Sequence, residues 1–223
     1  MTGTTEKGGA MQEDRKISRR TFLAGTGGAI VSIGLPGVFI KLADAKQRAL
    51  AADTRPDGRP RLPPGQLAVE RIRDMGGAPG TATIANWTLR VHDGEVEKSI
   101  VFSYQDLLNL DQVQITCDIH CVTGWTLLDS RWGGVRLTTI MDRVRPHRSA
   151  GFVIFEAAGD YTSNIPMSEA RKGDVILAHS FFGEKLQQAH GAPVRALIPD
   201  RYFYKSAKWM EAVKITSRDE PGF

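Results

Sequence analysis

The chain has 223 residues, of which 41% are hydrophobic and 24% are charged, and its formal net charge is +4. These proportions are those of an ordinary globular protein, which excludes extensive disorder, and the length is enough for one domain with a sizeable core. Lysine and arginine form no long block of like charge, which argues against a nucleic-acid-binding protein. We therefore expect no nucleic acid among the partners, although a local anion site would not register in the net charge.

Residues 1–45 have the form of an export signal. Ser18-Arg-Arg-Thr-Phe-Leu23 carries the paired arginines of a twin-arginine signal, an apolar, glycine-rich run follows over residues 23–40, and Ala43-Asp-Ala45 suits cleavage. The hypothesis is export to the periplasm. The alternative is a membrane anchor through residues 23–40, because about 18 residues is the lower limit for crossing a bilayer. The twin-arginine route carries folded proteins, often with a cofactor installed, so the signal favours a cofactor-containing protein.

Residues 46–82 are rich in proline and glycine and contain little to pack, so we expect an extended arm laid over a domain that spans residues 83–223. In that domain, short strands and short helices mix without regular alternation, which predicts the α+β class with a mixed β-sheet. Strands are expected over residues 87–91, 96–102, 113–116, 152–155, 175–182, 194–198 and 209–215, and helices over residues 104–110, capped by Ser103, and 137–144. No Gly-x-Gly-x-x-Gly motif follows a strand, which disfavours a nucleotide cofactor.

The only two cysteines, Cys117 and Cys121, follow a short apolar strand. Gly124 and the pair Gly133-Gly134 are expected to mark bends beyond it. A thiol placed where a buried strand gives way to a loop is fixed in position and yet accessible from outside the strand. That is the geometry required of a metal ligand or a nucleophile.

Three other interpretations of the cysteines stay open. Both thiols could be small core residues, since free cysteine is among the most buried residue types. They could form a disulfide if a turn lies between them, although on a continuous strand their Cα atoms would lie roughly 13 Å apart. Cys117, His120 and Cys121 could also bind zinc, although no fourth ligand is evident.

A second group of candidate residues is basic. Arg195 stands in an otherwise apolar strand, so it either faces solvent at a sheet edge or pairs with an anion. Lys205 and Lys208, beside Trp209, could reach the same anion. Arginine binds phosphate through two parallel hydrogen bonds and lysine binds it as a point charge. Together with the thiol and the export signal, this pattern indicates a phosphate-bearing metal cofactor.

Five motifs occur in a characteristic order: Cys121-Val-Thr-Gly-Trp-Thr126, Trp132-Gly-Gly-Val135, Tyr161-Thr-Ser-Asn-Ile-Pro166, His190-Gly-Ala-Pro-Val-Arg195 and Lys205-Ser-Ala-Lys-Trp209. Over roughly residues 85–220 the chain thereby resembles the molybdopterin-binding domain shared by sulfite oxidases and the periplasmic methionine-sulfoxide reductase catalytic subunit. The resemblance implies a sulfite-oxidase-like fold and a molybdenum-molybdopterin cofactor. It further implies two-electron oxygen-atom transfer on a small-molecule substrate, either a sulfur oxyanion or a sulfoxide. Because no haem-binding Cys-x-x-Cys-His motif is present, electrons are expected to be exchanged with a separate cytochrome or membrane quinone-linked subunit.

The resemblance also implies roles for individual residues. Cys121 is expected to bind molybdenum beside the two dithiolene sulfurs of a single pterin. His190 and Arg195 are expected to hold the pterin and its phosphate. Further cofactor contacts, through backbone and side chain, are expected from Ser206, Ala207 and Lys208. A soft thiolate suits a metal that sulfur already binds, and the oxygen-atom transfer itself belongs to the cofactor.

Two further residues are assigned as candidates. His120 adjoins the metal ligand and is expected to line the substrate pocket or relay a proton, with a packed histidine as the alternative. Tyr161 is expected to face the metal. Val122-Thr123 stand where sulfite-binding members carry an arginine pair, which weakens sulfite as the substrate, and the glycine-rich region 73–79 offers no residue to assign. The alternative function is a non-catalytic exported binding or assembly module that retains the fold.

Overall fold

The computed structural model describes residues 49–50 and 52–222. The export signal and the anchor predicted for residues 1–45 lie outside the described residues. Within the described part of the chain, no helix is long and apolar enough to cross a bilayer.

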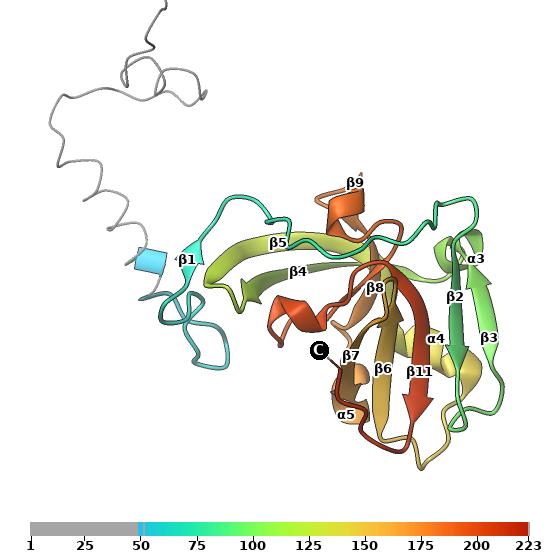
Figure 1. Cartoon of the computed structure of the whole chain (residues 1–223). Helices are drawn as coiled ribbons and strands as arrows, with labels where there is room; N and C mark the ends of the chain where they lie inside the picture. Colours follow the sequence, from blue (N-terminus) through green and yellow to red (C-terminus); the bar gives the residue numbers. More distant parts are fainter. Residues whose placement is uncertain (1–48, 51, 223) are drawn as a thin grey trace, which may run out of the picture. The chain divides into compact units, whose positions relative to one another are not determined.

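The first of two sheets carries the cysteine motif. It has six strands in the order β1-β5-β8-β10, with β4 paired to β5 and β9 paired to β8. The strands are β1 (Leu67–Ala68), β4 (Gln112–Cys121), β5 (Trp125–Arg136), β8 (Ile176–Phe181), β9 (Glu184–Lys185) and β10 (Arg195–Leu197). β1 runs parallel to β5, whereas the other pairs are antiparallel. Figure 1 shows β4 and β5 as a long paired ribbon whose turn end lies near β1.

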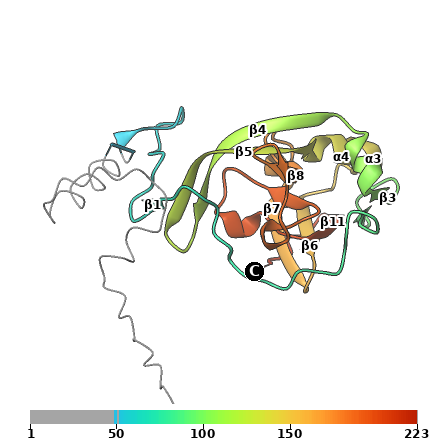
Figure 2. The same cartoon turned by 90° about the horizontal axis from the view of Figure 1, so that it is seen from above.

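The second sheet has five strands in the order β3-β2-β11-β6-β7. They are β2 (Thr88–His92), β3 (Ile100–Ser103), β6 (Phe152–Ala157), β7 (Tyr161–Pro166) and β11 (Met210–Thr216). Only the pair β2–β11 is parallel in this sheet. Seen from above, β6, β7 and β11 are separate from the β4–β5 ribbon (Figure 2).

The helices are short and local sequence explains them. Those after residue 100 are α3 (Tyr104–Leu108), α4 (Leu137–Val144), α5 (Met167–Ala170) and the 3₁₀ turns η1 (Gln188–His190) and η2 (Phe203–Lys205). Ser103 caps α3 as predicted, because its hydroxyl accepts from Asp106 N while the Asp106 carboxylate accepts from Ser103 N. The apolar face predicted for α4 is buried as Leu137, Ile140, Met141 and Val144. Mixed sheets with a few short helices confirm the α+β class.

The core has two parts. The larger cluster packs α3 and α4 against the five-stranded sheet and includes Leu89, Phe155 and Val213. The smaller cluster surrounds Trp125 and Trp132. This second cluster also contains Cys121, so the candidate metal ligand is supported by packed aromatic side chains.

Two local predictions are wrong, one about where a strand ends and one about a pair of glycines. β4 continues to Cys121 instead of ending at residue 116, and Gly133 and Gly134 lie inside β5 instead of marking a bend after a strand. A Cβ atom at residue 134 would lie 2.2 Å from the Leu177 carbonyl oxygen of β8, and one at residue 133 would lie 2.3 Å from Ser180 Oγ. The glycines therefore allow two strands to approach closely, where β5 and β8 shift register. β3 also begins later than predicted, at residue 100, and β7 was not predicted as a strand.

Candidate active site

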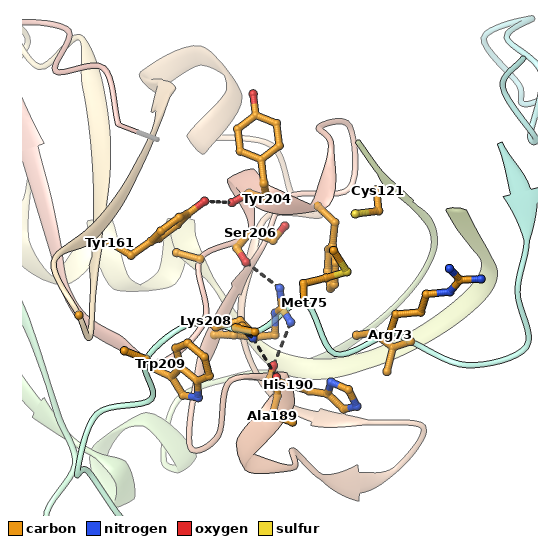
Figure 3. A pocket seen from close by; sticks show the side chains of 18 of the residues that line it. Arg73, Met75, Cys121, Tyr161, Ala189, His190, Tyr204, Ser206, Lys208 and Trp209 are labelled. Atoms are coloured by element: carbon orange, nitrogen blue, oxygen red, sulfur yellow. Dashed lines mark hydrogen bonds between the residues drawn. The ribbon is translucent and has the colours of Figure 1, made fainter. Parts of the chain in front are cut away.

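A cavity of about 380 Å³ brings together segments that are distant in the sequence. Its walls are formed by residues within the segments 72–78, 121–123, 158–161, 189–195 and 203–209. Figure 3 shows Cys121 on one side of this space and Lys208, Trp209 and His190 on the other. A thiol and a group of basic side chains thus border one cavity, with no packed core between them.

Cys121 is held at the tip of the β4–β5 hairpin. It is the last residue of β4 and pairs with Trp125, so Val122, Thr123 and Gly124 form a three-residue loop. Gly124 has a φ of +87° and its N–H donates to the Cys121 carbonyl at 3.0 Å, as loops of this length require. The Cys121 Sγ lies 3.1 Å from Thr123 Oγ1. The sulfur is therefore fixed by a strand end and faces the cavity.

Cys117 has a different environment. Both cysteines are free thiols, so the disulfide alternative is wrong. Cys117 does not line the cavity, its Sγ lies 3.7 Å from Ser130 Oγ, and burial raises the pKa of its thiol to about 12. Among residues 49–50 and 52–222 there is no group of three His, Cys, Asp or Glu side chains suited to a metal ion. The core interpretation therefore fits Cys117, and Cys121 alone of the two meets the cavity.

Arg195 is a buried cation without an acidic partner. It lines the cavity from β10 with 1% of its surface exposed, so the solvent-facing alternative is wrong. Its three nitrogens donate to the carbonyl oxygens of Ala196 at 3.2 Å, His190 at 2.9 Å and Ser206 at 2.6 Å. Its Cζ lies 4.1 Å from the centroid of the Phe203 ring. No carboxylate of the described residues offsets the charge, and burial lowers the pKa of Arg195 to about 9.

Two more basic groups lie beside Arg195. The Lys208 ammonium donates to the carbonyl oxygens of Gly76 and Ala189, the latter at 3.0 Å. Burial lowers the pKa of His190, and the positive charge of Arg195 lowers it further. Burial also lowers the pKa of Lys208, where the carboxylate of Asp74, 3.8 Å from the ammonium, raises the pKa and the charge of Arg195 lowers it. Burial is the largest cause of the lowered pKa at Arg195, His190 and Lys208, and the exposed Asp74 is the one carboxylate of the described residues that acts against it. The arrangement suits a bound anion such as a phosphate.

The remaining predicted contacts are divided between the cavity and the protein interior. Ser206 and Ala207 line the cavity, but the Ser206 hydroxyl accepts from Ile198 N at 2.9 Å and so supports the loop after β10. Tyr161 also lines the cavity. Its hydroxyl donates to the Tyr204 carbonyl at 2.5 Å, and burial raises its pKa, which keeps the phenol protonated at neutral pH.

Two basic or titratable candidates lie away from the cavity. His120 is 9% exposed and does not line the cavity, and its Nδ1 lies 2.9 Å from Thr126 Oγ1. Burial lowers the pKa of His120, so the packed alternative describes its surroundings. Lys205 does not line the cavity either, because its ammonium donates to Asn164 Oδ1 at 2.5 Å.

Sequence reasoning missed the contribution of the arm. Arg73, Met75, Gly76, Gly77 and Ala78 all line the cavity. The glycine pair was a usable signal, because Gly77 has a φ of +102° and a Cβ there would lie 2.7 Å from the Trp209 ring. The sequence does not reveal that partner, which lies more than a hundred residues away.

Comparisons with known proteins agree with this chemistry. Residues 75–223 match the family described as the oxidoreductase molybdopterin binding domain. The uncharacterized oxidoreductase YuiH of Bacillus subtilis is 34% identical over 165 residues, which are 73% of this chain and 83% of that protein. The protein-methionine-sulfoxide reductase catalytic subunit MsrP of Burkholderia mallei is 26% identical over an alignment of 236 positions, gaps included, that covers 93% of this chain and 70% of that protein.

A solved structure shares the fold. The sulfane dehydrogenase SoxCD from Paracoccus pantotrophus matches with a TM-score of 0.58 and 19% identity, over 95% of this chain and 60% of that one. The cavity also fits the cofactor of the family, since it offers a thiol for a metal and buried cations for a phosphate. The chain therefore belongs to the oxidoreductase molybdopterin-binding family, that of sulfite oxidases and the methionine-sulfoxide reductase catalytic subunit, and is a molybdopterin-dependent oxidoreductase.

Proposed function

We propose that this chain is an exported molybdenum enzyme that transfers an oxygen atom, with two electrons, to or from a small sulfur compound. It exchanges those electrons with a separate redox protein, a cytochrome or a membrane quinone-linked subunit. The observation that supports the proposal is that the Cys121 thiol and the buried Arg195, which has no carboxylate partner among the described residues, border one cavity. A buried arginine without a carboxylate is costly unless a ligand supplies the anion.

The residues that line the cavity have distinct roles in this proposal. Cys121 would bind the molybdenum through its thiolate, and the cofactor when bound supplies the oxygen-atom transfer. Each terminal nitrogen of Arg195 keeps one N–H beyond those given to carbonyl oxygens, and these would donate to the phosphate. The Lys208 ammonium and the His190 ring would complete the anion site, with Ser206 and Ala207 forming its floor.

The rim of the cavity favours a neutral sulfoxide as substrate. Met75, Val122 and Tyr204 line the cavity and are nevertheless 46%, 64% and 43% exposed, so an entering molecule meets apolar surface first. Reduction of a sulfoxide consumes two electrons and two protons and gives a thioether and water. Tyr161 lines the cavity and is the candidate for contact with the sulfoxide oxygen, which would take the phenolic hydrogen now donated to the Tyr204 carbonyl. A sulfur oxyanion is the second candidate, because Arg73 adds a cation to the same rim.

Activity and metal content test this proposal together. The full chain is exported from a host that assembles the cofactor, and molybdenum per chain is measured beside dye-linked sulfoxide reduction and sulfite oxidation. We expect one molybdenum in the wild type and in Cys117→Ser, none in Cys121→Ser, and faster turnover of the sulfoxide. A wild type that carries no molybdenum would overturn the proposal. A Cys121→Ser variant with unchanged function would favour the non-catalytic module.

Export is tested separately. Replacing Arg19 and Arg20 by lysine keeps the charge but removes the arginine pair, so the chain should remain in the cytoplasm. Cell fractionation measures this, and unchanged export of the double variant would refute the assignment of residues 1–45.

A further inference from the structure

A network of hydrogen-bonded side chains, those of Gln66, Thr126 and His120, links the arm to the backbone of Cys121. Gln66 Nε2 donates to the Cys121 carbonyl oxygen at 3.0 Å, and Gln66 Oε1 accepts from Thr126 Oγ1 at 3.2 Å. The same Thr126 oxygen lies 2.9 Å from His120 Nδ1. Thr126 is fully buried and faces His120 across the β4–β5 pair. These contacts are distinct from those that line the cavity.

Backbone hydrogen bonds hold the arm in register with β5 beside this side-chain network. Leu67 N donates to Gly124 O at 3.0 Å and Val69 N donates to Thr126 O at 2.8 Å, so β1 continues the sheet beside the hairpin tip. Gln66 comes directly before β1, and its side chain is therefore presented to the hairpin by paired backbone. Gln66 also precedes residue 75, where the match to the family begins.

The direction of these three side-chain hydrogen bonds follows from one fact, that a carbonyl oxygen only accepts. The amide atom of Gln66 that faces the Cys121 carbonyl must then be the donor Nε2, which turns Oε1 toward Thr126. Oε1 only accepts, so Thr126 must give its single hydroxyl hydrogen to it. The Thr126 oxygen can then only accept from His120, which requires the proton of the neutral imidazole to be on Nδ1.

We propose that a hydrogen-bonded network of Gln66, Thr126 and His120 positions the metal-binding Cys121. Gln66 is the residue that contacts the Cys121 backbone, and His120 holds the other end of the network as its Nδ1–H tautomer. The proposal rests on the proposed function, in which Cys121 is the ligand. Gln66 Nε2 and Gly124 N together occupy both lone pairs of the Cys121 carbonyl, so the peptide that carries the ligand cannot rotate freely. Groups that orient a metal ligand are typically worth 10- to 100-fold in affinity or activity.

The tautomer of His120 is tested first, because it does not depend on the metal. Nitrogen-15 NMR of the full-length protein, as purified and oxidised, distinguishes a protonated Nδ1 from a protonated Nε2. We expect the Nδ1–H form in the wild type and a changed tautomer balance in Thr126→Val, which removes the acceptor at nearly constant volume. A wild type with the proton on Nε2 would contradict the direction of these hydrogen bonds and would overturn the proposal.

The effect on the ligand is tested with Gln66→Glu and the uncharged, similarly sized Gln66→Met. Methionine and an ionised glutamate cannot donate to the Cys121 carbonyl, whereas Gln114→Glu makes the same charge change at an exposed position of β4. We expect both Gln66 variants to keep most of their molybdenum, to shift its reduction potential and sulfur-to-metal absorption band, and to lose about tenfold in kcat with little change in KM. Gln114→Glu should match the wild type.

The outcomes separate the two proposals. If both Gln66 variants show the wild-type potential and absorption band, the positioning role is refuted while the proposed function stands. If the wild type contains no molybdenum, the proposed function fails, and the tautomer measurement still decides whether the hydrogen-bonded chain exists.

Discussion

Arg195 allows the sharpest test of the idea that the cavity is built for an anion. Burial lowers its pKa from 12.5 to about 9, which corresponds to a penalty on the order of 5 kcal/mol on the charged form. Three hydrogen bonds to carbonyl oxygens and the Phe203 ring offset part of this penalty. Arg195→Met removes the penalty and these contacts together, but it leaves the carbonyl oxygens of His190 and Ser206 without this donor, which cancels part of the gain. In protein without cofactor we therefore expect the free energy of unfolding to change by less than about 2 kcal/mol.

The cofactor-loaded protein should respond differently. Loss of a charged hydrogen bond to a phosphate costs about 1.5–3 kcal/mol, so the Met variant should lose cofactor at least tenfold more readily. Arg195→Lys keeps the charge without the planar guanidinium, so its cofactor retention should lie between those of the wild type and Arg195→Met.

Urea unfolding of protein made with and without cofactor supply measures both effects, and molybdenum content measures retention. The reasoning is refuted if Arg195→Met loses more than about 4 kcal/mol without cofactor and yet retains the cofactor as the wild type does. That result would make the guanidinium a purely structural group.

Three further predictions concern other parts of the molecule. Lys208→Met should lower cofactor retention after gel filtration at least tenfold, since its ammonium is the second cation of the site; equal retention would remove Lys208 from it. Because the Cys117 thiol has a pKa near 9.0 when unfolded and about 12 when folded, stability should fall as pH rises above 9.0, by about 1.4 kcal/mol between pH 8 and 10. Urea unfolding of Cys117→Ser should lack this component, and an identical pH dependence in both proteins would contradict it. Gly134→Ala should lower the free energy of unfolding by about 1–3 kcal/mol or more in the same assay, because the new methyl meets the β8 backbone. Gly94→Ala, with open space around it, should change the free energy of unfolding little. Similar effects at both sites would be inconsistent with the close approach of β5 and β8.

Features set by nearby residues were predictable from the sequence. The helix Leu137–Val144 follows from apolar residues at helical spacing, and the Ser103 cap follows from the preference of that residue type at helix starts. The order of the cofactor motifs likewise sufficed to identify the family. In each of these cases the relevant physics acts within a few residues or within a fixed motif.

Features set by distant contacts were not predictable. Gly133-Gly134 indicated a bend because close approach to β8 has no local signature. Arg195 left two interpretations open, since an arginine in an apolar strand has the same sequence pattern at an exposed edge as in a buried anion site. Likewise, nothing near Gln66 indicates that its amide reaches the Cys121 carbonyl.

The central claim is that the sulfur of Cys121 is bonded to molybdenum. X-ray absorption at the molybdenum edge counts the sulfur neighbours of the metal directly. We predict three in the wild type and in Cys117→Ser, namely two from the pterin and one from the protein, and a loss of the third in any molybdenum that Cys121→Ser retains. Three sulfur neighbours in Cys121→Ser, or only two in the wild type, would contradict the account.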